Sequence, residues 1–326
     1  MEVKLGIIGA GRMGSVHAIN AAKYTSAKIV AIADINKSAA ESLAKQLGVK
    51  KIYSSYDNLI VDNEIDAVII TLPNNLHYDA IIKSIEAGKH VFCEKPLTVS
   101  VKEAEDITRK AEKADIKLQV GFNRRFDPSY EKAKEIIDQG LLGRIAHAHS
   151  NTYDPEPHSG WEGKEEISGG IFFTTCIHDF DLLNWLIGRK VKKVYAELRG
   201  TFGKDQSAVC LLAFENGAFA TVKAYELCSY GHDVKTEVIG DKAAIRVEQK
   251  SSTHLEIFTK AGVQTDYPYW FKDRFKTAYI REIQEFISCI LNDKNPRVNA
   301  YDGLNATKIA EAAKRSTMEN RPILVE

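Results

Sequence analysis

The 326-residue sequence lacks several features that would narrow its class at once. Its longest apolar runs are only strand length, whereas a helix that spans a membrane needs about 20 apolar residues. The 44 basic residues balance the 44 acidic residues, so no net field favours nucleic acid or an anionic membrane. The first residues have the pattern of a strand and lack the regions of a signal peptide. We therefore expect a soluble, cytoplasmic protein with no nucleic-acid or membrane partner.

Cysteine is scarce and never occurs as a C-x-x-C pair. The five cysteines are Cys93, Cys176, Cys210, Cys228 and Cys289. Their odd number and wide spacing argue against both a disulfide framework and a zinc knuckle, so we expect small buried residues and no metal. Repeats of fixed period are also missing. At this length, two domains with separate cores are expected.

The most informative stretch lies at the N-terminus, where an apolar run passes directly into GAGRMG and then into a segment compatible with a helix. In this setting the first glycine allows a tight turn, the second lets the backbone approach a pyrophosphate, and the third lets the helix pack on the strand. The helix N-terminus then faces the phosphates. The candidate cofactor contacts are Gly9, Gly11, Arg12, Met13 and Gly14.

A second apolar run, residues 28–33, ends in Asp34. At this distance from the glycines, a carboxylate would accept hydrogen bonds from the adenine ribose, although an ordinary aspartate at a strand end is the alternative. A carboxylate also repels a 2′-phosphate, and residues 35–37 contain no arginine to bind one. The sequence therefore predicts NAD rather than NADP as the cofactor, with Lys37 the one residue that could blur this preference.

Strands and helices alternate as far as residue 120, which predicts an α/β fold with a Rossmann-type, doubly wound parallel sheet. Ligands of such sheets bind beyond the carboxyl ends of the strands. The strand at 65–71 is followed by Leu72, Asn74 and His77, which we expect to line the cofactor pocket. For His77, a local hydrogen bond at the start of a helix is an equal alternative.

The next strand, residues 90–93, leads into Glu94, Lys95 and Pro96. Pro96 biases Lys95 toward an extended backbone. Glu94 could orient a neighbouring ammonium or amide, and Lys95 could polarise a substrate oxygen and donate a hydrogen bond to it. A lysine in this context is commonly part of a surface turn. Its position one strand after the 72–77 loop favours a catalytic and cofactor-side role.

A loop of about fifteen residues, rich in proline and glycine, is expected from residue 153, and loops of this length are usually functional. Its Asp154 and Trp161 are candidate contacts for a polyhydroxylated ligand. On the preceding strand, His147 and His149 alternate with alanines and so share one face. A third metal ligand is missing, so these histidines are not expected to hold an ion.

Residues 169–188, GGIFFTTCIHDFDLLNWLIG, carry apolar residues at helical spacing and predict one helix. In such a helix Thr174 and His178 lie one turn apart, with Thr175 nearby as a candidate substrate contact. His178 is a candidate general base because an imidazole titrates near neutral pH. The alternative is structural, since a lone histidine in a helix is more often structural than catalytic.

From residue 191 onward, six strand-like segments follow one another, the last at 254–260, without intervening helices. This run predicts an open, mostly antiparallel sheet in an α+β domain. Helices are expected at 277–291 and 303–318, with Asp302 as the N-cap of the second. The predicted domains are residues 1–121, which bind NAD, and residues 122–326, which bind substrate and form the oligomer. The last helix could pack back on the first domain.

Five segments together resemble the Gfo/Idh/MocA oxidoreductases, most closely their inositol dehydrogenase branch. They are GAGRMG with the later Asp34, LPNNLH, AGKHVFCEKPL, GFNRRFDPSY and GGIFFTTCIHDFDLLNWLIG. The resemblance implies an NAD-dependent dehydrogenase that oxidises a secondary hydroxyl of a cyclic polyol or sugar, inositol-like or aldose-like. It also implies that Asn123 faces the substrate and Arg125 the cofactor. A second subunit would cover the open sheet, giving a homodimer or homotetramer.

The sequence departs from this family at Thr174, where the relatives have an aspartate one turn before the histidine. A close carboxylate would raise the pKa of the imidazole by about one to three units, which threonine cannot do. A hydroxyl can still orient a ring or a substrate, so Thr174 stays a candidate catalytic residue. Two further functions therefore remain open: an NADPH-dependent keto-sugar reductase, and a non-catalytic protein that senses a dinucleotide or sugar.

Overall fold

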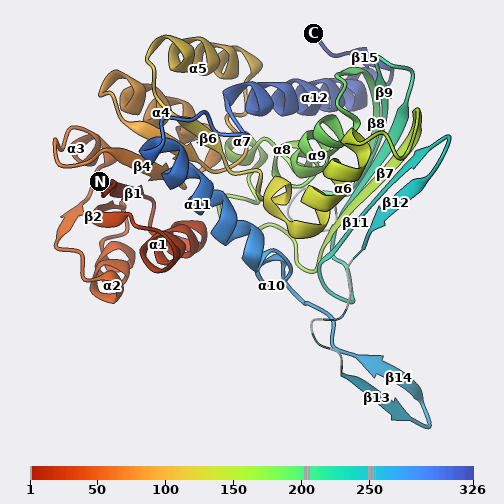
Figure 1. Cartoon of the computed structure of the whole chain (residues 1–326), viewed down its shortest axis with the longest axis horizontal. Coiled ribbons are helices and arrows are strands. Elements are labelled where there is room, and N and C mark those ends of the chain that lie inside the picture. The colour runs from red at the N-terminus through yellow and green to blue at the C-terminus, as the bar shows by residue number, and fades with distance from the viewer. Residues whose placement is uncertain (1, 202–203, 205, 249–250, 252, 254) are drawn as a thin grey trace. The chain divides into compact units, whose positions relative to one another are not determined.

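The computed structural model describes residues 2–201, 204, 206–248, 251, 253 and 255–326 (Figure 1). The chain divides into two compact units. Unit 1 comprises Met1–Phe126 and Thr277–Thr307, and unit 2 comprises Asp127–Lys276 and Lys308–Glu326. Each unit is therefore built from segments that lie far apart in the sequence.

Unit 1 contains a parallel sheet with the strand order β3-β2-β1-β4-β5-β6 among the residues described. Its strands are β1 (Lys4–Ile8), β2 (Lys28–Ala33), β3 (Lys51–Tyr53), β4 (Ala67–Ile70), β5 (His90–Cys93) and β6 (Leu118–Val120). The order reverses between β1 and β4, which is where dinucleotides bind in such sheets. The strand β4, AVII, is buried throughout, as expected for a strand covered on both faces. The predicted Rossmann-type sheet is confirmed.

The helices of unit 1 come from both of its segments. They are α1 (Arg12–Tyr24), α2 (Lys37–Leu47), α3 (Tyr56–Ile60), α4 (His77–Glu86), α5 (Val101–Lys113) and α11 (Lys276–Leu291), with 3₁₀ turns η1 (Asn74–Leu76) and η2 (Asn123–Phe126). One apolar cluster joins residues of β1, β2 and α1 to Ile283, Phe286 and Ile287 of α11. The late helix α11 is thus part of the core around the first strand and helix.

The helix α12 (Ala300–Glu319) begins earlier than expected, so Asp302 is not its N-cap. The Asn299 side chain accepts the N–H of Tyr301 at 2.9 Å, and the Asn299 N–H donates to the Asp302 carboxylate at 2.9 Å. This reciprocal pair is a capping box with Asp302 in the third helical position. The prediction was wrong because both residues are good caps and the sequence does not say which one ends the extended chain.

The main sheet of unit 2 has the order β12-β11-β7-β10-β9-β8-β15 in the described ranges. Its strands are β7 (Ile145–Asp154), β8 (Val191–Arg199), β9 (Ser207–Phe214), β10 (Phe219–Glu226), β11 (Asp233–Gly240), β12 (Ala244–Val247) and β15 (Ile323–Leu324). The pair β7/β10 is parallel, and the other described neighbours are antiparallel. The predicted mostly antiparallel sheet is confirmed. The Asn216-Gly217 turn joins β9 to β10 with Gly217 at φ +85°, as an antiparallel hairpin requires.

The helices of unit 2 are α6 (Pro128–Asp138), α7 (Glu165–Ser168), α8 (Ile171–Thr174), α9 (Ile177–Ile187) and α10 (Phe271–Arg274). The helix α9 packs on β7 and β10 and also contacts α6. Along β9, Ala208, Cys210 and Leu212 are buried, whereas Val209 and Leu211 between them are exposed. The sheet therefore has one buried face and one face with exposed apolar side chains.

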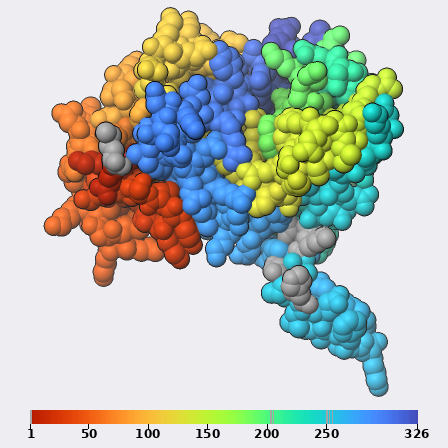
Figure 2. Space-filling view, in the orientation of Figure 1, coloured from red at the N-terminus to blue at the C-terminus, as the bar shows by residue number. Residues whose placement is uncertain are grey.

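The strands β13 (Glu256–Thr259) and β14 (Gly262–Thr265) pair with each other, apart from the seven-stranded sheet. Figure 2 shows them as a separate arm. The strand expected at 254–260 was wrongly assigned to the main sheet, and its first residue lies outside the described residues. All residues of both strands are exposed, so no buried face directed their pairing.

The single helix predicted over 169–188 is interrupted between α8 and α9. Thr175 has φ −109° and ψ −59°, and the Cys176 N–H bonds to the carbonyl of Ile171, five residues back. Thr174 and His178 are therefore not one regular turn apart on a continuous helix. Apolar residues continue through the break, so periodicity could not reveal it. The loop before α7 covers residues 155–164 and is shorter than predicted, because β7 extends to Asp154.

The structure also describes the cysteines, the lengths of the helices and the two histidines of β7. All five cysteines lie within the described ranges, and they are free and buried, as predicted. None of the helices in the described part of the chain is both long and apolar enough to cross a bilayer. His147 and His149 are both exposed on β7, consistent with one shared face.

Candidate active site

The glycine turn between β1 and α1 excludes side chains at two of its three glycines. Gly9 has φ +96°, and a Cβ there would lie 2.7 Å from the carbonyl oxygen of Thr71. A Cβ on Gly14 would lie 1.9 Å from the carbonyl oxygen of Gly9. A Cβ on Gly11 would meet no described atom within 4 Å, so the backbone is open to a ligand there. Arg12 and Met13 begin α1, whose first N–H groups can bind an anion.

Asp34 is tied to this turn through its carboxylate. One oxygen accepts the N–H of Ala10 at 2.6 Å, and the other accepts the N–H of Asn36 at 2.7 Å. Each carboxylate oxygen has a second lone pair that can accept a further hydrogen bond, such as one from a ribose hydroxyl. The structure therefore places the acid from the end of β2 next to the glycine turn of β1.

The residues after β4 fall into two groups. Leu72 is partly exposed, and Asn74 is buried in η1. His77 is fully buried, with Nδ1 2.7 Å from the Pro96 carbonyl and Nε2 2.9 Å from the Leu72 carbonyl. Burial lowers the pKa of His77, and a neutral ring can donate to only one of these carbonyls. The His77 ring thus lies between Leu72, in this loop, and Pro96, the residue after Lys95.

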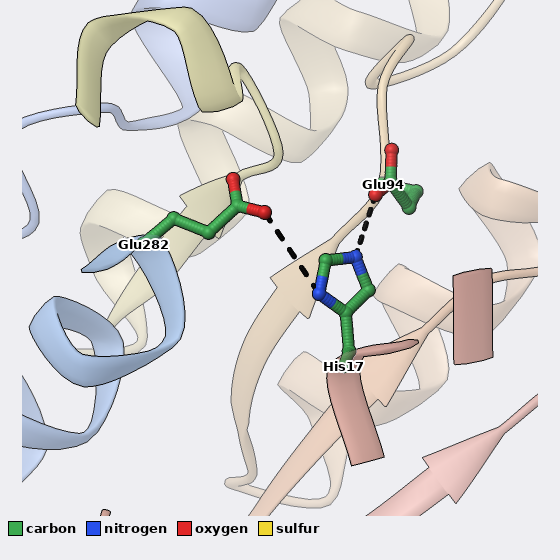
Figure 3. A group of neighbouring side chains, drawn as sticks. All are labelled: His17, Glu94 and Glu282. Carbon is green, nitrogen blue, oxygen red and sulfur yellow. Dashed lines mark hydrogen bonds and ion pairs between the residues drawn. The ribbon is translucent and has the colours of Figure 1, made fainter. Parts of the chain in front are cut away.

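Lys95 lies at the carboxyl end of β5 and is partly exposed, whereas Glu94 beside it is buried. The Glu94 side chain turns toward His17 of α1, and its Oε1 lies 2.6 Å from His17 Nε2 (Figure 3). Its Oε2 accepts the main-chain N–H of Lys95 at 3.1 Å. The glutamate therefore holds the backbone of Lys95 from inside unit 1.

Sequence reasoning missed the second acid of this cluster. Glu282 of α11 is wholly buried, and its Oε1 lies 3.8 Å from His17 Nδ1. Burial and the charge of Glu94 raise the pKa of Glu282 well above its usual range. Burial also acts to raise the pKa of Glu94, but His17 and Lys95 together outweigh it and lower that pKa. A signal was present, because Glu282 interrupts the apolar stripe of α11 and His17 lies on the buried face of α1.

The turn η2 contains Asn123 and Arg125, which were predicted to face the substrate and the cofactor, and both are buried. Asn123 is 2% exposed and Arg125 is 5% exposed, so neither is ordinary solvated charge or polarity. The Arg125 guanidinium donates to the Asp302 carboxylate at 2.8 Å. Arg125 is thus anchored to the first turn of α12 within unit 1.

In unit 2, the threonines before α9 differ in their partners. Thr174 is buried, and its hydroxyl donates to the Gly170 carbonyl at 3.2 Å. The Thr175 hydroxyl lies 3.1 Å from Nε2 of His158. His178 is partly exposed in the first turn of α9. The Thr174 hydroxyl therefore bonds back within its own turn, and the Thr175 hydroxyl contacts the 155–164 loop.

His158 and Glu226 form a pair that the sequence did not single out. Glu226, at the end of β10, is wholly buried, and its Oε1 lies 3.4 Å from His158 Nε2. Burial acts to lower the pKa of His158, but Glu162, Glu226 and Asp154 outweigh it, so that pKa is raised. The raised pKa favours the protonated form of a ring that lies beside the Thr175 hydroxyl. The pair of His158 and Glu226 joins the 155–164 loop to the end of β10, so only the tertiary structure reveals it.

Of the other predicted substrate residues, Asp154 directly precedes this loop and Trp161 lies within it. Asp154 ends β7, and its Oδ1 lies 3.0 Å from Nδ1 of the buried His232. Trp161 is partly exposed within the loop. Asp179 of α9 is buried and accepts hydrogen bonds from Ser150 at 2.5 Å and Thr152 at 2.7 Å. Asp179 therefore ties α9 to β7.

A parallel sheet with a glycine turn after β1 and an acid at the end of β2 defines the class of dinucleotide-binding proteins. Residues 3–122 match the family described as "Oxidoreductase family, NAD-binding Rossmann fold", and residues 134–325 match "Oxidoreductase family, C-terminal alpha/beta domain". The chain belongs to the Gfo/Idh/MocA oxidoreductase family, as predicted.

Individual relatives match over almost the whole chain. A Bacillus subtilis protein named uncharacterized oxidoreductase YrbE is 36% identical over 333 residues, covering 100% of this chain and 97% of its own. The scyllo-inositol 2-dehydrogenase (NAD(+)) of Bacillus subtilis is 35% identical over 335 residues, again covering 100% and 97%. The crystal structure of scyllo-inositol dehydrogenase from Lactobacillus casei with bound cofactor NAD(H) and scyllo-inositol has a TM-score of 0.92 and 31% identity, covering 100% of this chain and 99% of that one. The protein is thus similar in sequence and fold to inositol dehydrogenases.

Proposed function

We propose that the protein is an NAD-dependent dehydrogenase that oxidises a secondary hydroxyl of a cyclic polyol or sugar by hydride transfer to nicotinamide. The observation that carries the proposal is Lys95, which stands at the end of β5 with its backbone held by Glu94. Relatives named for scyllo-inositol, one of them a structure with NAD(H) bound, support the choice of substrate class. An inositol-like ring is therefore the first substrate to test.

The cofactor would be held by unit 1. The glycine turn would receive the pyrophosphate, and Asp34 would accept a ribose hydroxyl and disfavour a 2′-phosphate. Leu72 and Asn74 are proposed to contact the cofactor, with Arg125 on the same side. His77 and Glu94 would act indirectly, since their polar atoms brace the loop and the Lys95 backbone. Bound NAD would supply the hydride acceptor.

Proton handling is assigned to one residue from each unit. The Lys95 ammonium would donate a hydrogen bond to the substrate oxygen as charge develops on it. His178 would take the hydroxyl proton as a general base. The proposed substrate contacts are Lys95, Asn123, Asp154, Trp161, Thr175 and His178. The placement of Thr175 against His158, whose pKa is raised, supports a role in binding hydroxyl groups.

A non-catalytic sensing protein is the second candidate, and one observation favours it. Thr174 is a neutral side chain, so it supplies no negative charge that could strengthen His178 as a base, and its hydroxyl donates to the Gly170 carbonyl. The presence of both Lys95 and His178 argues for turnover. An NADPH-dependent keto-sugar reductase is disfavoured by the carboxylate of Asp34 at the glycine turn.

The protein is further proposed to be a cytoplasmic homodimer or homotetramer. The open face of the main sheet carries exposed apolar side chains, among them Val209, Leu211 and Phe219. A second copy packed on this face would remove them from water.

The test is nicotinamide reduction with NAD and then NADP across inositols, hexoses and pentoses, with keto-sugars in the reverse direction. Lys95→Met should lower turnover at least about 1,000-fold, because it removes both the charge and the hydrogen bond on the developing oxyanion. NAD affinity should be unchanged. The exposed Lys45→Met is the matched control and should keep full activity.

Three results would contradict parts of this proposal. Normal turnover by Lys95→Met would remove Lys95 from the mechanism. Silence in both directions with NAD still bound would favour the sensing protein, and tighter binding of NADPH than NADH would overturn the role of Asp34.

A further inference from the structure

A buried cluster of three ionisable side chains lies behind Lys95 in unit 1. Figure 3 shows the His17 ring of α1 between Glu94, at the end of β5, and Glu282, on α11. His17 and Glu282 are fully buried, and Glu94 is 8% exposed. Aromatic rings close the space, because Phe92 lies 4.9 Å and Tyr279 6.0 Å from the His17 ring, centroid to centroid. The cluster is sealed from water rather than open to a ligand.

The distances fit shared protons better than a metal ion. All three ligand atoms lie within 4.8 Å of one another, as a metal site would require. However, His17 Nε2 and Glu94 Oε1 are only 2.6 Å apart, a hydrogen-bond distance. Two atoms that each lie about 2.0–2.2 Å from one tetrahedral ion would be farther apart than this. The two glutamates also face different ring nitrogens, so an ion at one nitrogen would not bind both.

Charge balance decides where the protons reside. Two ionised glutamates around one buried ring would leave negative charge in a region of low dielectric, which is costly. The raised pKa of Glu282 and the lowered pKa of Glu94 divide the roles, so Glu282 holds its proton and Glu94 is the carboxylate. The nearby Tyr279 and Cys93 have pKa values raised mainly by burial and stay neutral.

Three cations also act on this region, namely Lys95, Arg12 and Arg124. Of these, Lys95 acts directly on Glu94 and helps to lower its pKa. The same carboxylate accepts the Lys95 N–H, so one group contacts both the buried histidine and the proposed catalytic lysine. Gly121 permits this arrangement, because a Cβ there would lie 3.3 Å from Glu94 Oε2.

We propose that His17 and Glu282 are positioning residues for Lys95: Glu282 stores a proton, His17 binds Glu94, and Glu94 thereby remains a carboxylate that fixes the Lys95 backbone and stabilises its ammonium. The proposal rests on the proposed function in taking Lys95 as the residue that contacts substrate. Neither His17 nor Glu282 needs to touch the substrate, since both act through Glu94. Gln119 supports the arrangement by donating to the Glu282 carbonyl at 2.8 Å, which holds α11 in place.

The first test follows the charge of Lys95 without requiring turnover. Lys95 is acylated with acetic anhydride over a range of pH, and its modification rate is measured by mass spectrometry. In His17→Leu, Glu94 loses its partner, and burial then favours its neutral form. The Lys95 ammonium is then less stabilised, so its acylation at a given pH should rise at least about threefold. The exposed Lys45 is the internal control and should not change.

The conservative variant separates the proposed role from general damage. His17→Gln keeps an N–H donor toward Glu94 and should bring the Lys95 acylation profile back toward that of the wild type. In kinetic assays, His17→Leu should move the acid limb of the kcat/KM profile to higher pH while NAD affinity is kept. Unchanged Lys95 acylation in His17→Leu, or equal effects of the Leu and Gln variants, would overturn the proposal.

The second test asks whether Glu282 carries the proton. A carboxyl that is protonated in the native state and ionised in the unfolded state makes stability fall as pH rises. For Glu282 this fall begins near the unfolded pKa of about 4.3. It continues up to the raised native pKa. Glu282→Gln should abolish this component between pH 5 and 8, measured by urea unfolding. The exposed Glu41→Gln is the matched control and should leave the slope unchanged.

A slope retained in Glu282→Gln would overturn the stored proton. These two tests separate this proposal from the proposed function. A wild type that turns over no polyol contradicts the dehydrogenase, whereas the Lys95 acylation profiles and the stability slopes still decide the link from Glu282 to Lys95.

Discussion

Units 1 and 2 each place a histidine against glutamates, and the ring is fully buried in unit 1 but partly exposed in unit 2. His17 of unit 1 is completely enclosed, with Glu94 on one nitrogen and the protonated Glu282 near the other. His158 of unit 2 faces Glu226 and Glu162 and also contacts the Thr175 hydroxyl. The pKa of His158 is raised, because these acids outweigh the cost of burial.

The comparison shows that burial alone does not set the charge of an acid that faces a histidine, because Glu94 and Glu282 are both buried and their pKa values shift in opposite directions. In unit 1, the pKa of Glu282 is raised and that of Glu94 is lowered, so Glu282 is the acid that keeps its proton. In unit 2, Glu162 and Asp154 are only partly buried, so ionised acids can surround the ring and stabilise its charged form. The first arrangement suits a fixed support behind a lysine, and the second suits a charge beside hydroxyl groups.

The largest expected effect comes from the residue proposed to exchange the substrate proton in unit 2. His178→Gln keeps a polar side chain but removes the general base, so turnover should fall about 10²–10⁴-fold. NAD affinity should be kept, because the proposed cofactor contacts belong to unit 1. Steady-state rates and a cofactor titration measure both quantities. The exposed His147→Gln should keep full activity, and full activity in His178→Gln would show that unit 2 does not supply the base.

A smaller effect is expected from Glu226→Gln, which would make the setting of His158 less negative. The pKa of His158 should fall by about one unit, equivalent to about 1.4 kcal/mol. The measurement is an NMR titration of the imidazole C–H resonances, with His158 assigned through His158→Gln. The exposed Glu215→Gln should leave that pKa unchanged. An unchanged pKa of His158 in Glu226→Gln would mean that Glu226 does not raise that pKa.

The smallest effect is expected on stability in His158→Gln. The native pKa of His158 is above its unfolded value of about 6.5, so its contribution to the free energy of unfolding is full below about pH 6.5. That contribution is lost as pH rises through the native pKa. The variant should therefore be less stable than the wild type by about 1 kcal/mol at pH 6, with the two converging at higher pH.

Urea unfolding across pH measures this difference. His149→Gln, on the exposed face of β7, is the control and should show no pH-dependent difference. A constant offset at every pH would contradict a charged His158.

The features of unit 1 that were predicted depend on neighbouring residues. The glycine turn needs a strand before it and a helix after it, and all three lie within the first 24 residues. The acid after β2 and the lysine after β5 follow from the rule that parallel strands end at one edge of the sheet. The family resemblance used the same segments, which is why the family and the sheet could be named before the structure.

The features that were missed depend on residues that are far apart in the chain. His17 and Glu282 come from α1 and α11, Glu94 directly follows β5, and no local pattern links the three. The pair of His158 and Glu226 likewise joins a loop to the end of β10. The break at Thr175 was missed because apolar spacing continues across it, although the backbone does not.

The sequence by itself determined the parallel sheet, the glycine turn and the identity of the lysine and histidine proposed for catalysis, because these depend on local geometry and on strand order. Only the tertiary structure decided which acids are ionised and which are protonated. The physical reason is that the pKa of a buried group depends on its distance from other charges and from water, and folding sets both distances. Glu282 illustrates this: its identity is plain from the sequence, but its burial beside Glu94, which raises its pKa, appears only in the fold.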